Sequence, residues 1–139
     1  MYGKVLVMQK VVGKIPDFCL SHWLLRIPLA TVFFQQGLFK LPVTEIDAAS
    51  FDLPYLVWWV VTWGEIGAGL GLVFGGVLAV SDKLAALGDL LTRFSGFTMG
   101  CIMTGVIWIS QPESIMDVIL YDNFHVLLWV GGLYFALRG

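Results

Sequence analysis

The amino-acid sequence predicts an all-α integral membrane protein, a four-helix bundle with both the N- and C-termini in the cytoplasm. Of its 139 residues, 58% are hydrophobic and 13% are charged, and a soluble domain carries about twice that share of charge. The mean hydropathy is +0.85, and the apolar residues fall in blocks near the ~20 residues that span a bilayer. Lipid cannot satisfy free backbone groups and four segments cannot close a barrel, so the spans are predicted to be helices.

Four apolar segments are the predicted spans, at about residues 22–39, 54–80, 93–109 and 119–137. They make up one transmembrane domain, residues 22–139, and the chain length leaves no room for a separate soluble domain. Residues 1–21 mix apolar residues with lysines. This pattern predicts a basic, amphipathic segment on the cytoplasmic surface of the membrane.

The distribution of charge predicts the orientation of these spans. In a four-span arrangement one side collects most of the cations, namely Lys4, Lys10, Lys14, Lys83, Arg93 and Arg138. The other side has Lys40 among six acids: Glu45, Asp47, Asp52, Glu113, Asp117 and Asp122. Because cytoplasmic loops are enriched in lysine and arginine, both termini are predicted to lie in the cytoplasm.

Glu65 is an ionisable residue within the second span. Counting from Pro54 at ~1.5 Å per residue places it ~16 Å into a hydrocarbon core ~30 Å thick. A charge there is costly unless it is paired. Arg26 on the antiparallel first span is the predicted partner, which would give an intramembrane ion pair. The alternative is that Arg26 extends to the inner interface and Glu65 stays protonated.

Small residues form stripes along two spans. The predicted packing positions are Gly64, Gly67, Gly71 and Gly75 on the second span, with Gly96 and Gly100 on the third. Such stripes let helix backbones approach closely in lipid. Close packing is favoured over a substrate groove, and the two stripes leave a homodimer open as an alternative.

A second polar group lies nearer the outer side. It comprises Gln35, Gln36 and Lys40 on the first span, with Asn123 and His125 at the start of the fourth. These side chains would suit a pocket for a small polar head group such as a quinone ring, although such residues are more often interfacial hydrogen-bonding groups. No metal site is predicted, because the two cysteines form no CxxC motif. Nothing is basic enough to predict nucleic-acid binding.

Several motifs together resemble the DoxX family of small four-helix bacterial membrane proteins. They are Arg26, then QQGLFKL with Gly37 and Lys40, then EIGAGLGLVFG beginning at Glu65, then LTRFSGF. The resemblance covers about residues 24–109. It implies a multi-pass protein of the bacterial cytoplasmic membrane, in a family with links to quinol oxidase, thiosulfate:quinone oxidoreductase and redox-stress systems.

The function predicted from this resemblance is that of a non-catalytic accessory subunit or partner of a membrane redox or electron-transfer complex. The expected partners are the lipid bilayer and a larger membrane protein complex, with no resident cofactor. Two alternatives stay open. One is a quinone-interacting oxidoreductase subunit, and the other is a small proton or solute transporter that uses Glu65.

Overall fold

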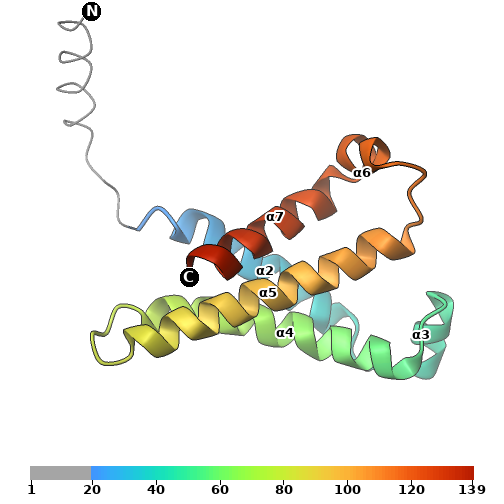
Figure 1. Cartoon of the computed structure of the whole chain (residues 1–139). Helices are drawn as coiled ribbons and strands as arrows, with labels where there is room; N and C mark the ends of the chain where they lie inside the picture. The colour runs from blue at the N-terminus through green and yellow to red at the C-terminus, as the bar shows by residue number, and fades with distance from the viewer. Residues whose placement is uncertain (1–19) are drawn as a thin grey trace, which may run out of the picture.

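The computed structural model describes residues 20–139, and every regular element in this part of the chain is an α-helix. Four helices are long: α2 (Trp23–Phe39), α4 (Tyr55–Leu78), α5 (Ala85–Ile109) and α7 (Asn123–Arg138). Two are short, α3 (Glu45–Ser50) and α6 (Ile115–Tyr121), and both lie at the same end of the molecule (Figure 1). The basic segment predicted for residues 1–21 falls outside the described residues except for its last two.

The long helices pack in a chain of neighbours, α2 on α4, α4 on α5 and α5 on α7, whereas α2 and α7 touch only slightly. Their shared core is apolar and includes Leu29, Phe33, Leu72, Met99 and Phe135. These side chains come from all four long helices. The core therefore sits where the four helices meet, and the outward faces stay apolar and exposed.

Two of the described helices, α4 and α5, are long and apolar enough to cross a membrane. A third span is obtained if α6 and α7, which are bent by 98° at their junction, are counted together. Helix α2 has 17 residues and is therefore ~26 Å long, shorter than a ~30 Å hydrocarbon core. Residues 20–139 are thus all-helical, with two or three helices able to span a membrane, and four complete crossings remain a prediction.

The third predicted span begins too late, because α5 starts at Ala85 rather than at residue 93. Asp89 and Arg93 both lie within α5 and stabilise it. The Arg93 guanidinium donates to the Asp89 carboxylate one turn earlier, at 2.8 Å, a pairing that supports helices. It also donates to the carbonyls of Leu137 and Arg138 at the end of α7.

The fourth predicted span, 119–137, is also corrected, because the helix breaks at Asp122. That residue has φ −116° and ψ 35°, and its carboxylate lies 2.5 Å from Nδ1 of His125 in the first turn of α7. None of the residues of α6 is buried. Without a packed face to align it with α7, α6 turns away and lies across the end of the molecule (Figure 1).

Glycines allow the long helices to approach closely. A Cβ atom added at Gly75 would lie 2.9 Å from the carbonyl oxygen of Gly88 on α5. One added at Gly96 would lie 2.5 Å from the carbonyl oxygen of Gly132 on α7. Backbone atoms cannot move aside as side chains can, so these crossings require glycine.

The other four predicted packing glycines differ in their surroundings. Gly71 faces Ser95 and Leu91 on α5, and a Cβ at Gly64 would lie 3.2 Å from Ile102. Gly100 has room, because a Cβ there would lie 3.6 Å from Leu133. A Cβ at Gly67 would meet nothing within 4 Å, so this glycine makes no close contact with another described helix of the chain.

Candidate functional site

The first buried charged centre is an ion pair between α2 and α4. Lys40, the residue directly after α2, places its Nζ 2.5 Å from Oε2 of Glu65. Glu65 is only 2% exposed, and Lys40 is partly buried. The Lys40 ammonium group also donates to the carbonyl of Gln36 at 3.5 Å. The carboxylate is therefore neutralised within the chain, as a buried charge requires.

Gly37 sets the distance between the two helices at this pair. A Cβ added there would lie 2.9 Å from the carbonyl oxygen of Thr62 and 3.0 Å from the backbone nitrogen of Ile66. The backbone of α2 thus lies directly on α4 one turn before Lys40. This contact brings the lysine within reach of Glu65, which precedes Ile66 on α4.

An aromatic ring lies beside the lysine of this pair. The Lys40 ammonium lies 5.6 Å from the centre of the Trp58 ring, within the range of a cation–π contact. Trp58 is buried and stacks on Phe51 with ring centres 5.0 Å apart. The Glu65 carboxylate is consequently covered by protein, whereas Lys40 stays partly exposed. A covered carboxylate suits a fixed link between helices more than a group that exchanges protons with water.

The predicted pairing of Arg26 with Glu65 is wrong. Among residues 20–139 the ion-pair partner of Glu65 is Lys40, and the Arg26 guanidinium donates to the Leu72 carbonyl and, at 3.0 Å, to the Thr92 hydroxyl. The reason is the register of the two helices. Leu72 lies seven residues beyond Glu65 on α4, which is ~10 Å along the helix axis, so Arg26 is too far from the carboxylate.

Arg26 is the second buried charged centre, with 2% of its surface exposed. Besides its two hydrogen bonds, its guanidinium lies 4.7 Å from the ring centre of Phe135 and 5.6 Å from that of Trp23. Its Nε has no hydrogen-bond partner. One side chain on α2 therefore contacts α4, α5 and α7 together, and no carboxylate is among the contacts described for it.

The residues of the predicted polar pocket lie in different surroundings. Gln35, Gln36 and Asn123 are exposed, whereas Lys40 is engaged by Glu65. His125 is half-buried and pairs with Asp122, as described above. None of the five lines the cavity described next.

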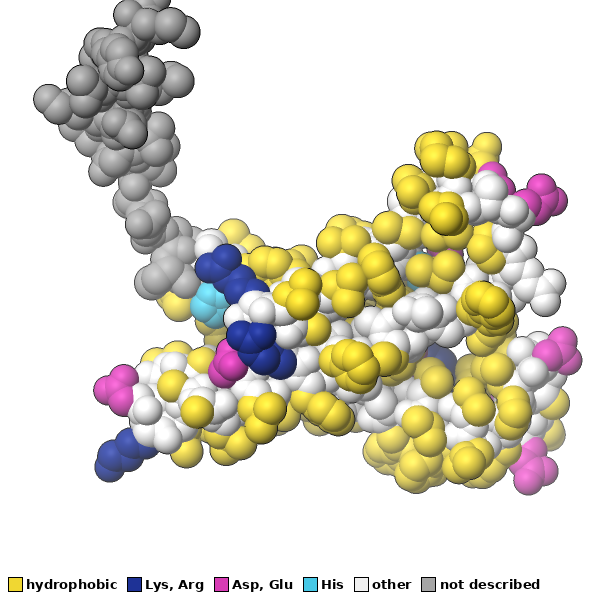
Figure 2. Space-filling model, in the orientation of Figure 1, with side chains coloured by type: hydrophobic (Ala, Val, Ile, Leu, Met, Phe, Trp, Pro, Cys, Tyr) yellow, Lys and Arg dark blue, Asp and Glu magenta, His cyan; other side chains and the backbone are white. Residues whose placement is uncertain are grey.

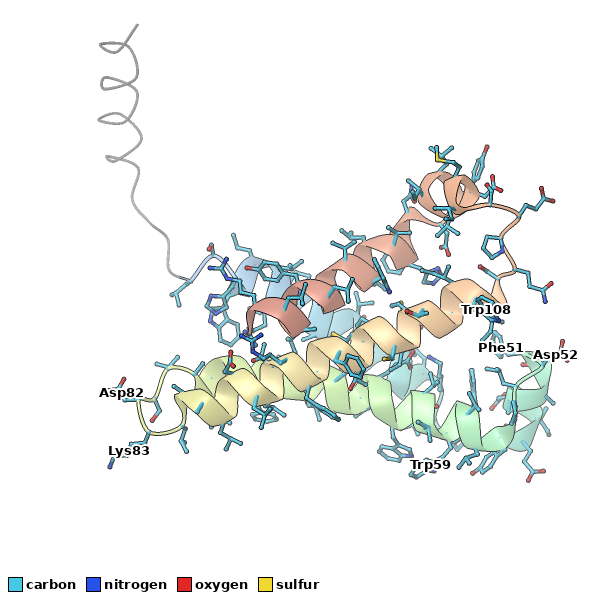
Figure 3. All side chains as sticks on the ribbon, viewed as in Figure 1. Phe51, Asp52, Trp59, Asp82, Lys83 and Trp108 are labelled. Atoms are coloured by element: carbon cyan, nitrogen blue, oxygen red, sulfur yellow. The ribbon has the colours of Figure 1, made fainter. Side chains whose placement is uncertain are left out.

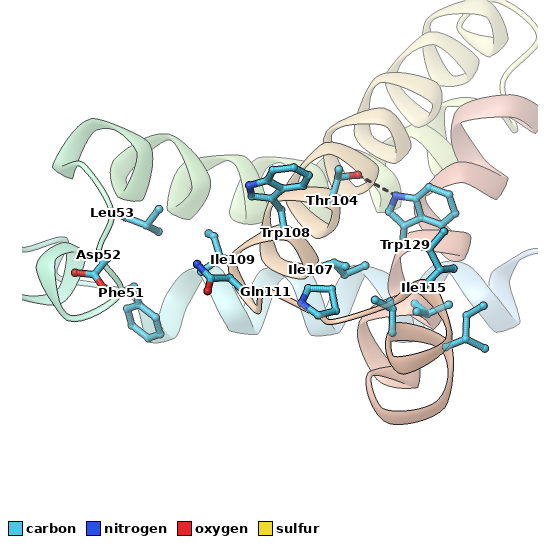
Figure 4. Close-up of a pocket in the computed structure, with 14 residues that line it drawn as sticks. Phe51, Asp52, Leu53, Thr104, Ile107, Trp108, Ile109, Gln111, Ile115 and Trp129 are labelled. Atoms are coloured by element: carbon cyan, nitrogen blue, oxygen red, sulfur yellow. Dashed lines mark hydrogen bonds between the residues drawn. The ribbon is translucent and has the colours of Figure 1, made fainter.

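A cavity of about 910 Å³ opens between the end of α5, α6 and the segment after α3 (Figure 4). We call it the α5–α6 cavity. Its aromatic walls are Phe51, Trp108 and Trp129, and Thr104 accepts a 3.0 Å hydrogen bond from the Trp129 indole. Asp52 and Gln111 supply further polar groups, and aliphatic side chains of α5, α6 and α7 cover the rest. Its size and apolar lining are typical of small-molecule sites.

Metal-binding side chains do not gather in the described part of the chain, where no group of three or more His, Cys, Asp or Glu residues has the geometry to hold a metal ion. Cys101 is exposed on α5. The chemistry that residues 20–139 offer is therefore that of two buried charged centres and one apolar cavity with a single carboxylate.

Comparison with known families identifies the class of protein. The model of the DoxX family matches residues 22–112, a segment that contains α2, α4, α5 and both buried charged centres. The chain belongs to the DoxX family, as its motifs predicted. No curated protein matches the sequence, and no solved structure matches the fold.

Sequence reasoning missed Lys40 as the partner of Glu65, although both residues were recognised separately. The sequence feature that could have identified this pair is the Gly37-x-x-Lys40 spacing. Gly37 lets α2 approach α4 closely, and Lys40, one turn later, therefore also lies beside α4. The α5–α6 cavity left no comparable signal, because its walls come from segments far apart in the sequence.

Proposed function

We propose that this member of the DoxX family is a non-catalytic accessory subunit or partner of a larger redox or electron-transfer complex in the bacterial cytoplasmic membrane. The observation that carries the proposal is the Lys40–Glu65 pair, whose carboxylate is buried. The intramembrane acid is used to join two helices of the chain itself, so it supports a structural role. The redox context comes from what membership of the family implies.

The proposed topology has four membrane crossings with both termini in the cytoplasm. By their places in the chain, Lys83, Arg93 and Arg138 belong to one end of the long helices together with Asp82 and Asp89, and the acids of α3 and α6 belong to the other. Figure 2 shows Lys and Arg side chains gathered mainly at one end, with Asp and Glu side chains at both. This separation supports the orientation, because cations favour the cytoplasmic side. The short α2 would cross with the help of local thinning of the bilayer.

The two alternative functions have less support. A transporter that uses Glu65 would need a water-accessible carboxylate, whereas this one is enclosed by Lys40, Trp58 and α2. A quinone site built from Gln35, Gln36 and His125 would need these side chains to line a common cavity. The α5–α6 cavity is built from other residues.

Mild extraction of source membranes tests the accessory role. We expect the tagged chain to migrate on a native gel with a larger assembly whose mass spectrum contains redox subunits. A tagged, unrelated membrane protein of similar size, expressed to the same level, is the control for chance co-migration. Migration of the chain by itself under conditions that keep known complexes intact would contradict the proposal.

The variant Glu65→Gln distinguishes a structural role of the Lys40–Glu65 pair from a role of Glu65 in transport. We expect lower accumulation or lower stability of this variant, because the amide cannot neutralise Lys40. A variant that accumulates normally in proteoliposomes but loses a proton flux shown by the parent chain would favour transport.

A further inference from the structure

The α5–α6 cavity has one acidic end and no basic lining residue among the residues described. Asp52 and Gln111 lie toward one end of the cavity, and Trp129 and the aliphatic side chains of α6 lie toward the other (Figure 4). Asp52 is the single charged residue among those that line it. This distribution matches an elongated molecule with a polar head and an apolar body.

The surroundings strengthen the negative character of this end of the molecule. Glu45 and Asp47 lie on α3, and Glu113 and Asp117 lie beside or on α6, whereas Asp122 at the end of α6 is engaged by His125. The described cation nearest in sequence to α3, Lys40, is already neutralised by Glu65. Acidic groups clustered around a low-dielectric cleft raise the local concentration of cations and repel anions.

Aromatic faces provide a second attraction for a cation. Trp108 is 82% exposed although it lines the cavity, and Phe51 lines the wall beside Asp52. Lipophilic cations are held by the negative faces of such rings. A carboxylate that lines the same cavity as an exposed indole ring is therefore a recognition surface for a positively charged head group.

Backbone strain is found at the polar end of the same cavity. Asp52 has φ 53° and Gln111 has φ 47°, and these are the two positive-φ residues other than glycine in the described part of the chain. Both line the cavity. Side chains adopt this backbone region at a cost, and such residues cluster at binding sites.

We propose that the α5–α6 cavity binds an amphipathic cation, with the positive head near Asp52 and the Trp108 ring and the apolar body against α6 and α7. No step of this inference depends on the accessory role proposed above. The accessory role is tested by co-migration with a complex, and cation binding is tested with the isolated chain. A negative result in either experiment therefore does not contradict the other proposal.

A matched pair of probes tests the charge preference. Methyltriphenylphosphonium is a lipophilic cation, and triphenylphosphine oxide carries the same three phenyl rings without a net charge. Each would be titrated by calorimetry into the full chain in phosphatidylcholine nanodiscs, and the signal of empty nanodiscs would be subtracted. We expect the cation to bind about tenfold more tightly, and this preference to weaken at high salt.

Two variants remove the proposed contacts without disturbing the core. Asp52→Asn should weaken binding of the cation about fivefold, and asparagine tolerates the positive φ of this position. Trp108→Leu should weaken it about threefold. Asp82→Asn and Trp59→Leu are the matched controls, because both residues are exposed and neither lines the cavity (Figure 3). Neither control should change the affinity.

Three results would overturn the proposal. The first is an equal affinity for the charged and neutral probes, or a preference for the neutral one, which would indicate an uncharged ring as the ligand. The second is unchanged binding of the cation by Asp52→Asn and Trp108→Leu. The third is no binding beyond that of empty nanodiscs.

Discussion

The two buried charged centres of the molecule are neutralised in different ways. Glu65 has a full ion pair with Lys40, whereas the described partners of Arg26 are a backbone carbonyl, a hydroxyl and two aromatic rings. A carboxylate can only accept hydrogen bonds, and a guanidinium can only donate them. Inside a helical bundle the backbone N–H groups are already used, but carbonyl oxygens keep a free lone pair. A buried cation therefore finds partners there more easily than a buried anion does.

Removal of Lys40 should have the largest effect. Lys40→Met leaves the Glu65 carboxylate buried without a partner, and we expect it to lower the free energy of unfolding by about 3–5 kcal/mol. Unfolding in mixed micelles of sodium dodecyl sulfate, followed by circular dichroism, measures this change. If the variant unfolded like the parent chain, the ion pair would contribute nothing to the fold.

Arg26→Met should have a smaller effect, because it leaves no unpaired charge behind. The loss of the two hydrogen bonds and the ring contacts should lower the free energy of unfolding by about 2 kcal/mol. The same unfolding assay measures it, with Arg138→Met at the exposed end of α7 as the control. If Arg26→Met lowered the free energy of unfolding more than Lys40→Met does, Arg26 and not the Lys40–Glu65 pair would contribute more to stability.

Gly37→Ala tests whether close helix contact supports the Lys40–Glu65 pair. The added methyl group would meet the backbone of α4, and overpacking of this kind should cost about 1–2 kcal/mol. Gly67→Ala is the matched control, because its methyl group has open space and alanine favours helix. Equal stability of the two variants would show that α2 has room to move away from α4 without cost.

From the sequence we predicted that a cation on the neighbouring helix neutralises Glu65. We assigned that role to Arg26, whereas the structure gives it to Lys40. Depth counted from helix ends cannot give the register between two helices, which depends on where Gly37 brings the backbone of α2 against α4. The helix content and the family followed from composition and motifs. The break at Asp122 and the α5–α6 cavity did not, because both depend on how α6 packs at the end of the molecule.

A double-mutant cycle tests the central claim most directly. Unfolding free energies would be measured for Lys40→Met, Arg26→Met and Glu65→Gln, and for each cation variant combined with Glu65→Gln. We predict a coupling energy above about 1 kcal/mol between Lys40 and Glu65. Between Arg26 and Glu65 we predict a coupling within about 0.5 kcal/mol of zero. Strong coupling of Glu65 to Arg26 with none to Lys40 would contradict the account.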